Sequence, residues 1–281
     1  RCLVGSEMCI RDSADIEYTH PKYFFDKAIY DRRVYNGVGK ADPSVEIKFG
    51  PNIKDWPEMV PLTDNLLLKV ASVIHDPVTT TDELIPSGET SSYRSNPLGL
   101  AEFTLSRKDP EYVGRAKAIQ AVEKVREAGE CMGKAFPEVK EVMHAIKEKF
   151  EDVCGSNTGV GSTIYAVKPG DGSAREQAAS CQKVLGGWAN IAKEYATKRY
   201  RSNLINWGML PFVIDKDFDF DNDDYVFIPG IKDAVKNKTE VIKAYVVNKD
   251  FAEIELRLGE LTDDERQIIT DGCLINYYKY N

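Results

Sequence analysis

The ten residues GDGSAREQAA, 170–179, are the stretch around which this chain is organised. They follow residues 162–167, whose β-branched and apolar side chains are typical of a short buried strand. Gly170 and Gly172 permit a tight turn after that strand. A helix is expected to begin near Ser173, so the segment predicts a strand, a glycine turn and a helix in succession.

The start of that helix carries the side chains that could do chemistry. Ser173 and Glu176 have the S-x-x-E spacing of a capping box, which would hold the hydroxyl beside the first free amides. With Arg175 in its first turn, such a helix start can bind a carboxylate or phosphate. The local pattern alone still favours an ordinary capped helix with an exposed arginine.

A second polar segment lies about ninety residues upstream. Residues 79–82, TTTD, follow the strongly apolar run 66–74, and Arg94 lies twelve residues beyond Asp82. Taken singly, Asp82 is best interpreted as a turn cap and Arg94 as part of a solvated loop. A third short motif, GMLP, occupies residues 208–211.

Together these motifs resemble the aconitase superfamily. Residues 170–179 are similar to its GxGSSREHAA signature, which occurs in the mobile C-terminal swivel domain and in small subunits of isopropylmalate isomerases. Residues 79–82 resemble the family's TTDH segment, and residues 208–211 resemble its GLLP turn. The resemblance extends over roughly residues 50–281.

The resemblance implies a role for each matched position. Ser173 would be the catalytic base, and Asp82 would assist it. Arg94 and Arg175 would bind substrate carboxylates. Ala174, which stands where the family has its second serine, is counted with the substrate-binding positions.

Three departures from the family pattern keep other functions open. Ala174 replaces the second serine, Gln177 replaces the signature histidine, and Glu83 replaces the histidine after the aspartate. One alternative is therefore a non-catalytic module that binds anions or regulates. Another is a stand-alone small subunit of an isopropylmalate-isomerase-type dehydratase.

The resemblance also implies a [4Fe-4S] cluster, which the family holds with three cysteines in its preceding domains. The six cysteines of this chain are scattered, with no CxxC pair and no zinc-like spacing with its three histidines. We therefore expect no metal ligands here. The expected partners are a small carboxylate substrate and the cluster-bearing N-terminal domains of the same enzyme, without which this chain should be inactive.

The chain is expected to consist of three parts. Residues 3–13 resemble one reading frame of a transposase end used to tag sequencing libraries, so residues 1–13 are interpreted as a non-native tail. Residues 14–60 are predicted to be a remnant of a preceding domain and a linker. Residues 61–281 would form the swivel domain, which makes the chain a C-terminal fragment.

The order of predicted elements indicates an α/β fold. Strands and helices alternate without strict β-α-β spacing, which favours a mixed, barrel-like sheet with helices packed around it. The predicted strands are 66–74, 162–167, 188–192, 211–214, 225–228, 241–247 and 251–258. The predicted helices are 109–130, 137–151, 174–185, 195–206 and a last one that ends at Gly272. Asp109 is the expected N-cap of the first, and residues 262–265 have the capping-box spacing at the start of the last.

Composition limits the possible partners. A net charge of −8 over 281 residues argues against a general DNA-binding or anionic-membrane surface. No apolar run approaches the length that spans a bilayer. A reducing, cytoplasmic setting is expected because the six cysteines are scattered along the sequence and form no CxxC pair.

Overall fold

A computed structural model describes residues 19–33, 39–46 and 48–280, and it divides the chain into two compact units, 1–48 and 49–281. In the first unit, helix α2 spans Ala28–Arg33. The predicted tail, residues 1–13, lies outside the described residues. The predicted boundaries of the other two parts stay predictions.

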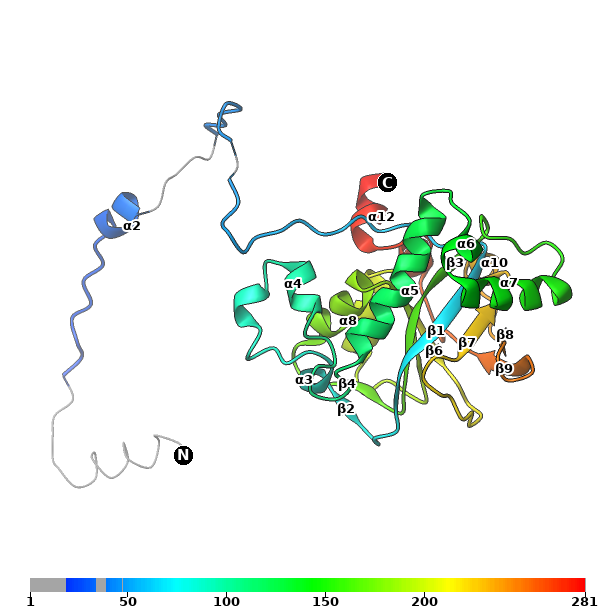
Figure 1. Cartoon of the computed structure of the whole chain (residues 1–281). Helices are drawn as coiled ribbons and strands as arrows, with labels where there is room; N and C mark the ends of the chain where they lie inside the picture. Colours follow the sequence, from blue (N-terminus) through cyan, green and yellow to red (C-terminus); the bar gives the residue numbers. More distant parts are fainter. Residues whose placement is uncertain (1–18, 34–38, 47, 281) are drawn as a thin grey trace, which may run out of the picture. The chain divides into compact units, whose positions relative to one another are not determined.

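The second unit is built on one mixed sheet of seven strands in the order β6-β5-β3-β1-β7-β8-β9 (Figure 1). Strands β6, β5, β3 and β1 run parallel to one another, whereas β7 is antiparallel to β1, β8 to β7 and β9 to β8. The bounds are β1 Asn65–Ile74, β3 Thr158–Ala166, β5 Gly187–Ala192, β6 Leu210–Val213, β7 Tyr225–Ile228, β8 Ile242–Val246 and β9 Ala252–Leu256.

The sheet curls into a half-barrel whose two edges meet. Val213, at the end of β6, forms an antiparallel bridge with Arg257, directly after β9. The Val213 amide donates to Arg257 O at 2.7 Å, and the Arg257 amide donates back at 2.9 Å. This bridge satisfies edge groups that an open sheet would leave unpaired, and it confirms the predicted mixed, barrel-like core.

Burial differs between the two halves of the sheet, as the sequence patterns require. All nine residues of β3 are buried, because helices cover one face and the core covers the other. In β1 the side chains alternate: Leu66 and Leu68 enter the core inside the half-barrel, whereas Leu67 packs with α5 and α7 on the other face. At the antiparallel end, β8 alternates buried and more exposed residues.

The helices surround the sheet, with α5 lying across β1 and β3 (Figure 1). Helix α8 packs on β5, α9 packs on β6, and α8 and α9 contact each other. The bounds are α3 Thr81–Leu84, η1 Ser91–Tyr93, α4 Pro97–Ala101, α5 Tyr112–Glu127, α6 Met132–Ala135, α7 Pro137–Lys149, α8 Arg175–Val184, α9 Lys198–Asn206, α10 Ile231–Lys236, α11 Asp263–Asp271 and α12 Leu274–Tyr280.

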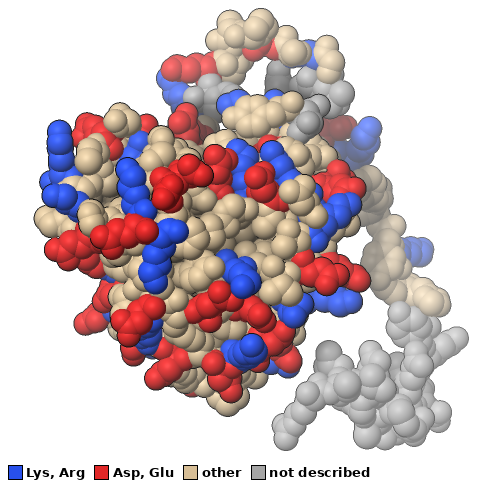
Figure 2. All heavy atoms as spheres, turned by 90° about the vertical axis from the view of Figure 1, so that its right-hand side faces the viewer, with Lys and Arg blue, Asp and Glu red and all other residues tan. Residues whose placement is uncertain are grey.

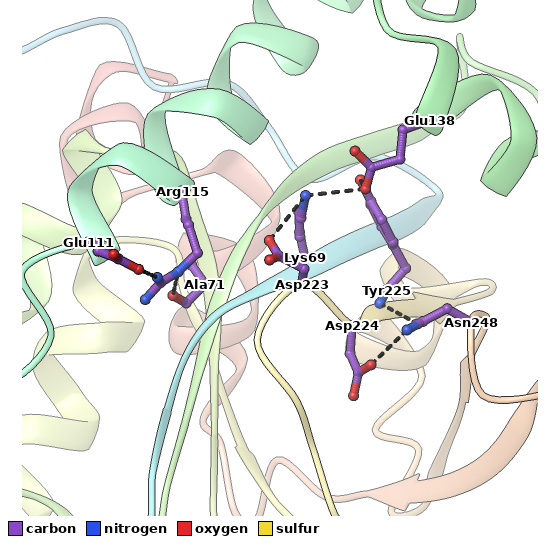
Figure 3. A network of polar contacts seen from close by, with 9 residues as sticks. All are labelled: Lys69, Ala71, Glu111, Arg115, Glu138, Asp223, Asp224, Tyr225 and Asn248. Atoms are coloured by element: carbon purple, nitrogen blue, oxygen red, sulfur yellow. Dashed lines mark hydrogen bonds and ion pairs between the residues drawn. The ribbon is translucent and has the colours of Figure 1, made fainter.

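A polar network ties α7 to the centre of the sheet (Figure 3). Lys69, on β1, pairs with Glu138 of α7 at 3.3 Å and with Asp223 at 3.2 Å. The Tyr225 hydroxyl donates to Glu138 Oε1 at 2.8 Å. Burial, together with the hydrogen bond to Glu138, raises the pKa of Tyr225. Each polar group of the network therefore has a partner, which suits a structural role.

The face seen in Figure 2 carries lysines and arginines interspersed with aspartates and glutamates. Several of the charges at this end of the sheet pair closely, such as Lys243 with Glu253 and Lys249 with Asp221, each at 2.8 Å. Neither sign of charge dominates this face. Among the described residues, no helix combines the length and the apolar character needed to cross a membrane.

One predicted helix cap was wrong, and so was the prediction of which helix comes last. Asp109 does not cap α5, which begins at Tyr112; instead its carboxylate accepts from Ser72 Oγ at 2.6 Å and pairs with Arg115. These contacts tie Asp109 to β1 rather than to the helix amides. The helix that ends at Gly272 is also not the last, because α12 follows it.

Candidate functional site

The two polar segments that lie about ninety residues apart in the sequence pair directly in space. Strand β2, Thr79–Thr80, is parallel to β4, Pro169–Asp171, in a separate two-stranded sheet (Figure 1). The Thr79 amide donates to Lys168 O at 3.0 Å. Because α3 follows β2 and the glycine turn follows β4, the pairing sets Asp82 and Ser173 on adjoining segments.

Gly172 lies where the two segments touch. A Cβ added at this position would lie 2.2 Å from Thr81 Oγ1, far inside van der Waals contact. The φ angle of Gly172 is 132°, which side chains other than hydrogen rarely permit. Thr81 itself is buried. The turn therefore needs glycine both for its backbone angle and for the close approach of α3.

Gly170 sets the other side of the turn against α9. A Cβ there would lie 2.3 Å from the ring of Tyr200, which is fully buried. Thr197 Oγ1 donates to Gly170 O at 3.2 Å. The Tyr200 hydroxyl accepts from Gln182 Nε2 at 2.9 Å and Asn190 Nδ2 at 2.7 Å. Burial raises the pKa of Tyr200, so this side chain is a neutral anchor for the turn.

The predicted capping box at the start of α8 was wrong. The N-cap is Ala174, without a side-chain hydrogen bond, and Ser173 lies one residue outside the helix with its side chain exposed. Glu176 instead accepts from Trp207 Nε1 at 3.2 Å. The physical reason is the course of the turn, which delays the helix by one residue and moves the S-x-x-E pair out of register.

An uncapped start leaves hydrogen-bond donors beside Ser173. The first helical hydrogen bond runs from the Ala178 amide to Ala174 O at 3.0 Å. The amides of residues 175–177 therefore have no partner within the helix. The Arg175 side chain is half-buried, and its Nε is buried without a hydrogen-bond partner among the residues that the structure describes. These donors, with the positive end of the helix dipole, favour an anion.

The capping box that does form is at α3. The Thr80 hydroxyl accepts from the Glu83 amide at 3.2 Å, and the Glu83 carboxylate accepts from the Thr80 amide at 2.7 Å. Partial burial opposes ionisation of Glu83, but the hydrogen bonds from Thr80 and from Lys108 outweigh it and hold its pKa below the usual range. This capping role accounts for a glutamate where the family has histidine.

Asp82, in the first turn of α3, is exposed and forms an ion pair with Arg107. Arg107 also pairs with Glu89 at 2.6 Å. The two carboxylates raise the pKa of Arg107, Glu89 more than Asp82. Asp82 is thus a solvent-facing carboxylate whose position is set by its arginine partner.

The structure brings four of the five predicted site positions together where β2 pairs with β4, a region that we call the functional corner. It places the fifth, Arg94, on a separate loop. Ser173, Ala174, Arg175 and Asp82 belong to the paired segments. Arg94 is exposed directly after η1. The following helix α4 packs against α8.

Sequence reasoning missed several residues that shape this corner. Thr81 contacts Gly172, Tyr200 contacts Gly170, and Arg107 pairs with Asp82. The two glycines did signal a close approach, although the sequence does not say what approaches them. Arg107 had no signal, because its partner lies 25 residues away and is brought near only by the fold.

No site for a metal cluster is present in the described part of the chain. No group of three or more His, Cys, Asp or Glu side chains there could hold a metal ion. Of the cysteines within the described ranges, Cys131 and Cys154 are exposed and Cys181 and Cys273 are buried, all as free thiols. The donor set does not fit an iron–sulfur cluster.

Comparison with known proteins gives three findings. Residues 147–217 match the aconitase C-terminal domain family. Aconitate hydratase A of Rickettsia bellii is 31% identical over 132 residues, which are 44% of this chain and 15% of that enzyme. A crystal structure of 3-isopropylmalate dehydratase from Methanocaldococcus jannaschii superposes with a TM-score of 0.47 and 22% identity, covering 77% of this chain and 94% of that one.

The match to the aconitase C-terminal domain family covers the functional corner only in part. It includes β3, β4 and the whole of α8, and therefore the glycine turn and Arg175. The segment with Asp82 and Arg94 lies outside residues 147–217.

Proposed function

We propose that this chain carries the swivel domain of the aconitase superfamily and is the C-terminal part of a hydratase or dehydratase, as the partial matches to that family and to an aconitate hydratase support. The substrate would be a di- or tricarboxylic hydroxy acid. The observation that carries this proposal is the pairing of β2 with β4, which sets Asp82 beside the turn that holds Ser173 and Arg175. Residues 79–82 and 170–179 resemble two motifs of the same family, and chance alone is unlikely to place two such segments side by side.

Ser173 is proposed as the base that removes the proton alpha to a substrate carboxylate. A serine hydroxyl is a weak base in water, so the developing alkoxide needs stabilisation. The free amides at the start of α8 and the Arg175 guanidinium supply positive potential there. The side chain of Ser173 is exposed, so water must be excluded by another part of the enzyme that closes over this corner.

Arg175 and Arg94 are proposed to hold the carboxylates. A guanidinium binds a carboxylate through two parallel hydrogen bonds, which fixes its orientation as well as its charge. The buried Nε of Arg175, which has no partner among the described residues, would gain one when substrate binds. Ala174, half-buried between Ser173 and Arg175, would contribute contact surface rather than a hydrogen bond.

Asp82, on the segment that follows β2, is proposed to assist Ser173 on the neighbouring segment that follows β4. Its ion pair with Arg107 holds the carboxylate in place. From this position it can orient a substrate hydroxyl or a water molecule toward Ser173.

The [4Fe-4S] cluster of the family would lie outside the described residues, which do not fit it. The cluster-bearing domains of the same enzyme are the proposed partner that closes the corner. The proposed setting is reducing and cytoplasmic, on the ground of the scattered cysteines in the sequence.

The test is the Ser173→Ala substitution in the complete enzyme. We expect kcat for dehydration of the hydroxy acid to fall about 10³-fold with KM changed less than threefold, because a base acts on the transition state more than on binding. Ser156→Ala, at an exposed serine outside the corner, is the control and should leave kcat unchanged. A loss below tenfold for Ser173→Ala would exclude this serine as the base.

A further inference from the structure

Two exposed cysteines, Cys131 and Cys154, belong to the two segments that form opposing parts of one cavity. The cavity has a volume of about 410 Å³ and is bounded by the turn before α6, by α7 and by the turn before β3. Its lining includes Cys131, Met132, Lys140, Met143, Gly155 and Ser156. Cys131 lines the cavity itself, and Cys154 immediately precedes Gly155 and Ser156, which also line it.

The two walls touch next to the cysteines. A Cβ on Gly155 would lie 3.2 Å from Met132 Cε, so the residue after Cys154 and the residue after Cys131 are in contact range. Cys154 Sγ lies 3.0 Å from Ser156 Oγ, which itself faces the cavity. A disulfide needs the two Cα atoms within about 7 Å. A disulfide between Cys131 and Cys154 would therefore draw the two walls of the cavity together.

Cys154 is the more reactive thiol of the pair by its surroundings. The Ser156 hydroxyl, followed by the backbone amide of Asn157, stabilises the thiolate and lowers the pKa of Cys154. An unperturbed thiol is only about 3% ionised at pH 7. The buried Cys181 shows the contrary case, since burial raises its pKa to about 12. Among the described thiols, reactivity should therefore concentrate at Cys154.

We propose that Cys154 and Cys131 form a hydroperoxide-reactive pair, with Cys154 as the attacked thiol and Cys131 as the resolving thiol. The Cys154 thiolate attacks one peroxide oxygen, the O–O bond breaks, and a sulfenic acid and water form after proton transfer. The Cys131 thiol then displaces the sulfenic hydroxyl as a second water and forms the disulfide. In sum, two thiols and one hydrogen peroxide give one disulfide and two waters.

The disulfide would link the ends of one structural segment. Residues 131–154 include α6 and α7, and α7 carries Glu138, the partner of Lys69 and Tyr225 (Figure 3). Closing this segment into a covalent loop would fix α7 to the sheet at a second point. The inference is independent of the proposed hydratase function, because none of these residues belongs to the functional corner.

The experiment treats the 281-residue chain with hydrogen peroxide at pH 7 and maps the products by mass spectrometry of tryptic peptides. We expect a linked pair of peptides 127–134 and 150–175, each of which contains one cysteine. With Cys131→Ser, the disulfide should be lost, and trapping by dimedone should detect a sulfenic acid at Cys154. With Cys154→Ser, oxidation of Cys131 should slow at least tenfold.

Ser156→Ala tests the cause of the reactivity without removing a thiol. It should slow alkylation of Cys154 by iodoacetamide several-fold at pH 7, and the difference should vanish near pH 10, where both variants are ionised. Cys181 should remain unlabelled under the same conditions. Faster oxidation at Cys131 than at Cys154, or a sulfenic acid that persists at Cys154 in the unsubstituted chain, would overturn the proposal. So would linkage of Cys154 to Cys2 or Cys9 instead of Cys131.

Discussion

Helices α8 and α11 begin in opposite ways. At α11, the Thr262 hydroxyl accepts from the Glu265 amide at 3.2 Å, and the Glu265 carboxylate accepts from the Thr262 amide at 2.8 Å. At α8, the N-cap is Ala174, whose side chain makes no such bond. The side chains of Thr262 and Glu265 bond to the free amides at the start of α11. The start of α8 leaves its amides unpaired next to Ser173 and Arg175.

The difference shows which helix start serves stability and which is available to a ligand. A capping box typically contributes about 1 kcal/mol to stability, and α11 has one. Helix α8 forgoes that contribution, and it is held in place by other means: the glycine turn, Tyr200 and its packing on β5. Free donors at a helix start that is fixed by its surroundings are suited to bind an anion.

The largest expected effect tests whether the turn before α8 depends on its close packing. Gly170→Ala should lower the free energy of unfolding by about 3 kcal/mol or more, because the φ angle is 97° and the added methyl would meet the Tyr200 ring. Urea unfolding of the chain measures this change in the free energy of unfolding. The control is Gly114→Ala in α5, where a Cβ meets nothing within 4 Å, and which should stabilise by about 0.5 to 1 kcal/mol. Equal effects at the two glycines would contradict the packing argument.

The next effect concerns the other end of α8. Lys183 is 6% exposed, its Nζ lies 3.8 Å from the Trp188 ring centroid, and it has no hydrogen-bond partner among the described residues. Burial lowers the pKa of Lys183 from 10.5 to about 8. Below pH 8 both the folded and the unfolded chain carry the charge, so the full cost of burying it remains. Between pH 8 and 10.5 the folded chain releases the proton first, and stability rises with pH.

Lys183→Met should therefore stabilise the chain by about 2 to 3 kcal/mol at pH 7, after allowing for the lost contact with Trp188. The gain should shrink through the window between pH 8 and 10.5. Urea unfolding at pH 7 and pH 10 measures both, with Lys198→Met, at an exposed position on α9, as the matched control. A gain that is the same at both pH values would mean that the buried charge is not its origin.

The smallest effect compares the two helix starts directly. Thr262→Ala should cost about 1 kcal/mol of stability, whereas Ser173→Ala should change stability by less than about 0.5 kcal/mol. Thermal unfolding of the two variants side by side is sufficient. A comparable loss for Ser173→Ala would show that its hydroxyl caps α8 in solution, contrary to the structure.

Much of the fold follows from sequence periodicity. Strand β7 was predicted at its observed bounds, and β1 was recognisable because an apolar run from 66 to 74 is buried on both faces. The box at Thr262 was also predicted correctly. Short elements such as β2 and β4 were not predicted, because two or three residues carry no periodic signal and their pairing depends on the rest of the fold.

The site was predictable as a set of residue types and not as a geometry. The resemblance selected Ser173, Arg175, Asp82 and Arg94, and these selections stay predictions. The spacing S-x-x-E was misleading at Ser173, because a capping box requires the chain to enter the helix at that residue, and the glycine turn enters one residue later. The same spacing gave the correct result at Thr262, where an extended residue leads directly into the helix.

The most direct test of the central claim is a double-mutant cycle between the two segments that β2 and β4 bring together. Kinetics of the complete enzyme would be measured for Asp82→Asn, Ser173→Ala and the double variant. If the segments act as one site, Asp82→Asn should lower kcat about 30-fold in the unsubstituted enzyme and less than threefold in the Ser173→Ala background. Losses that multiply, so that Asp82→Asn costs about 30-fold in both backgrounds, would show that the two segments act independently.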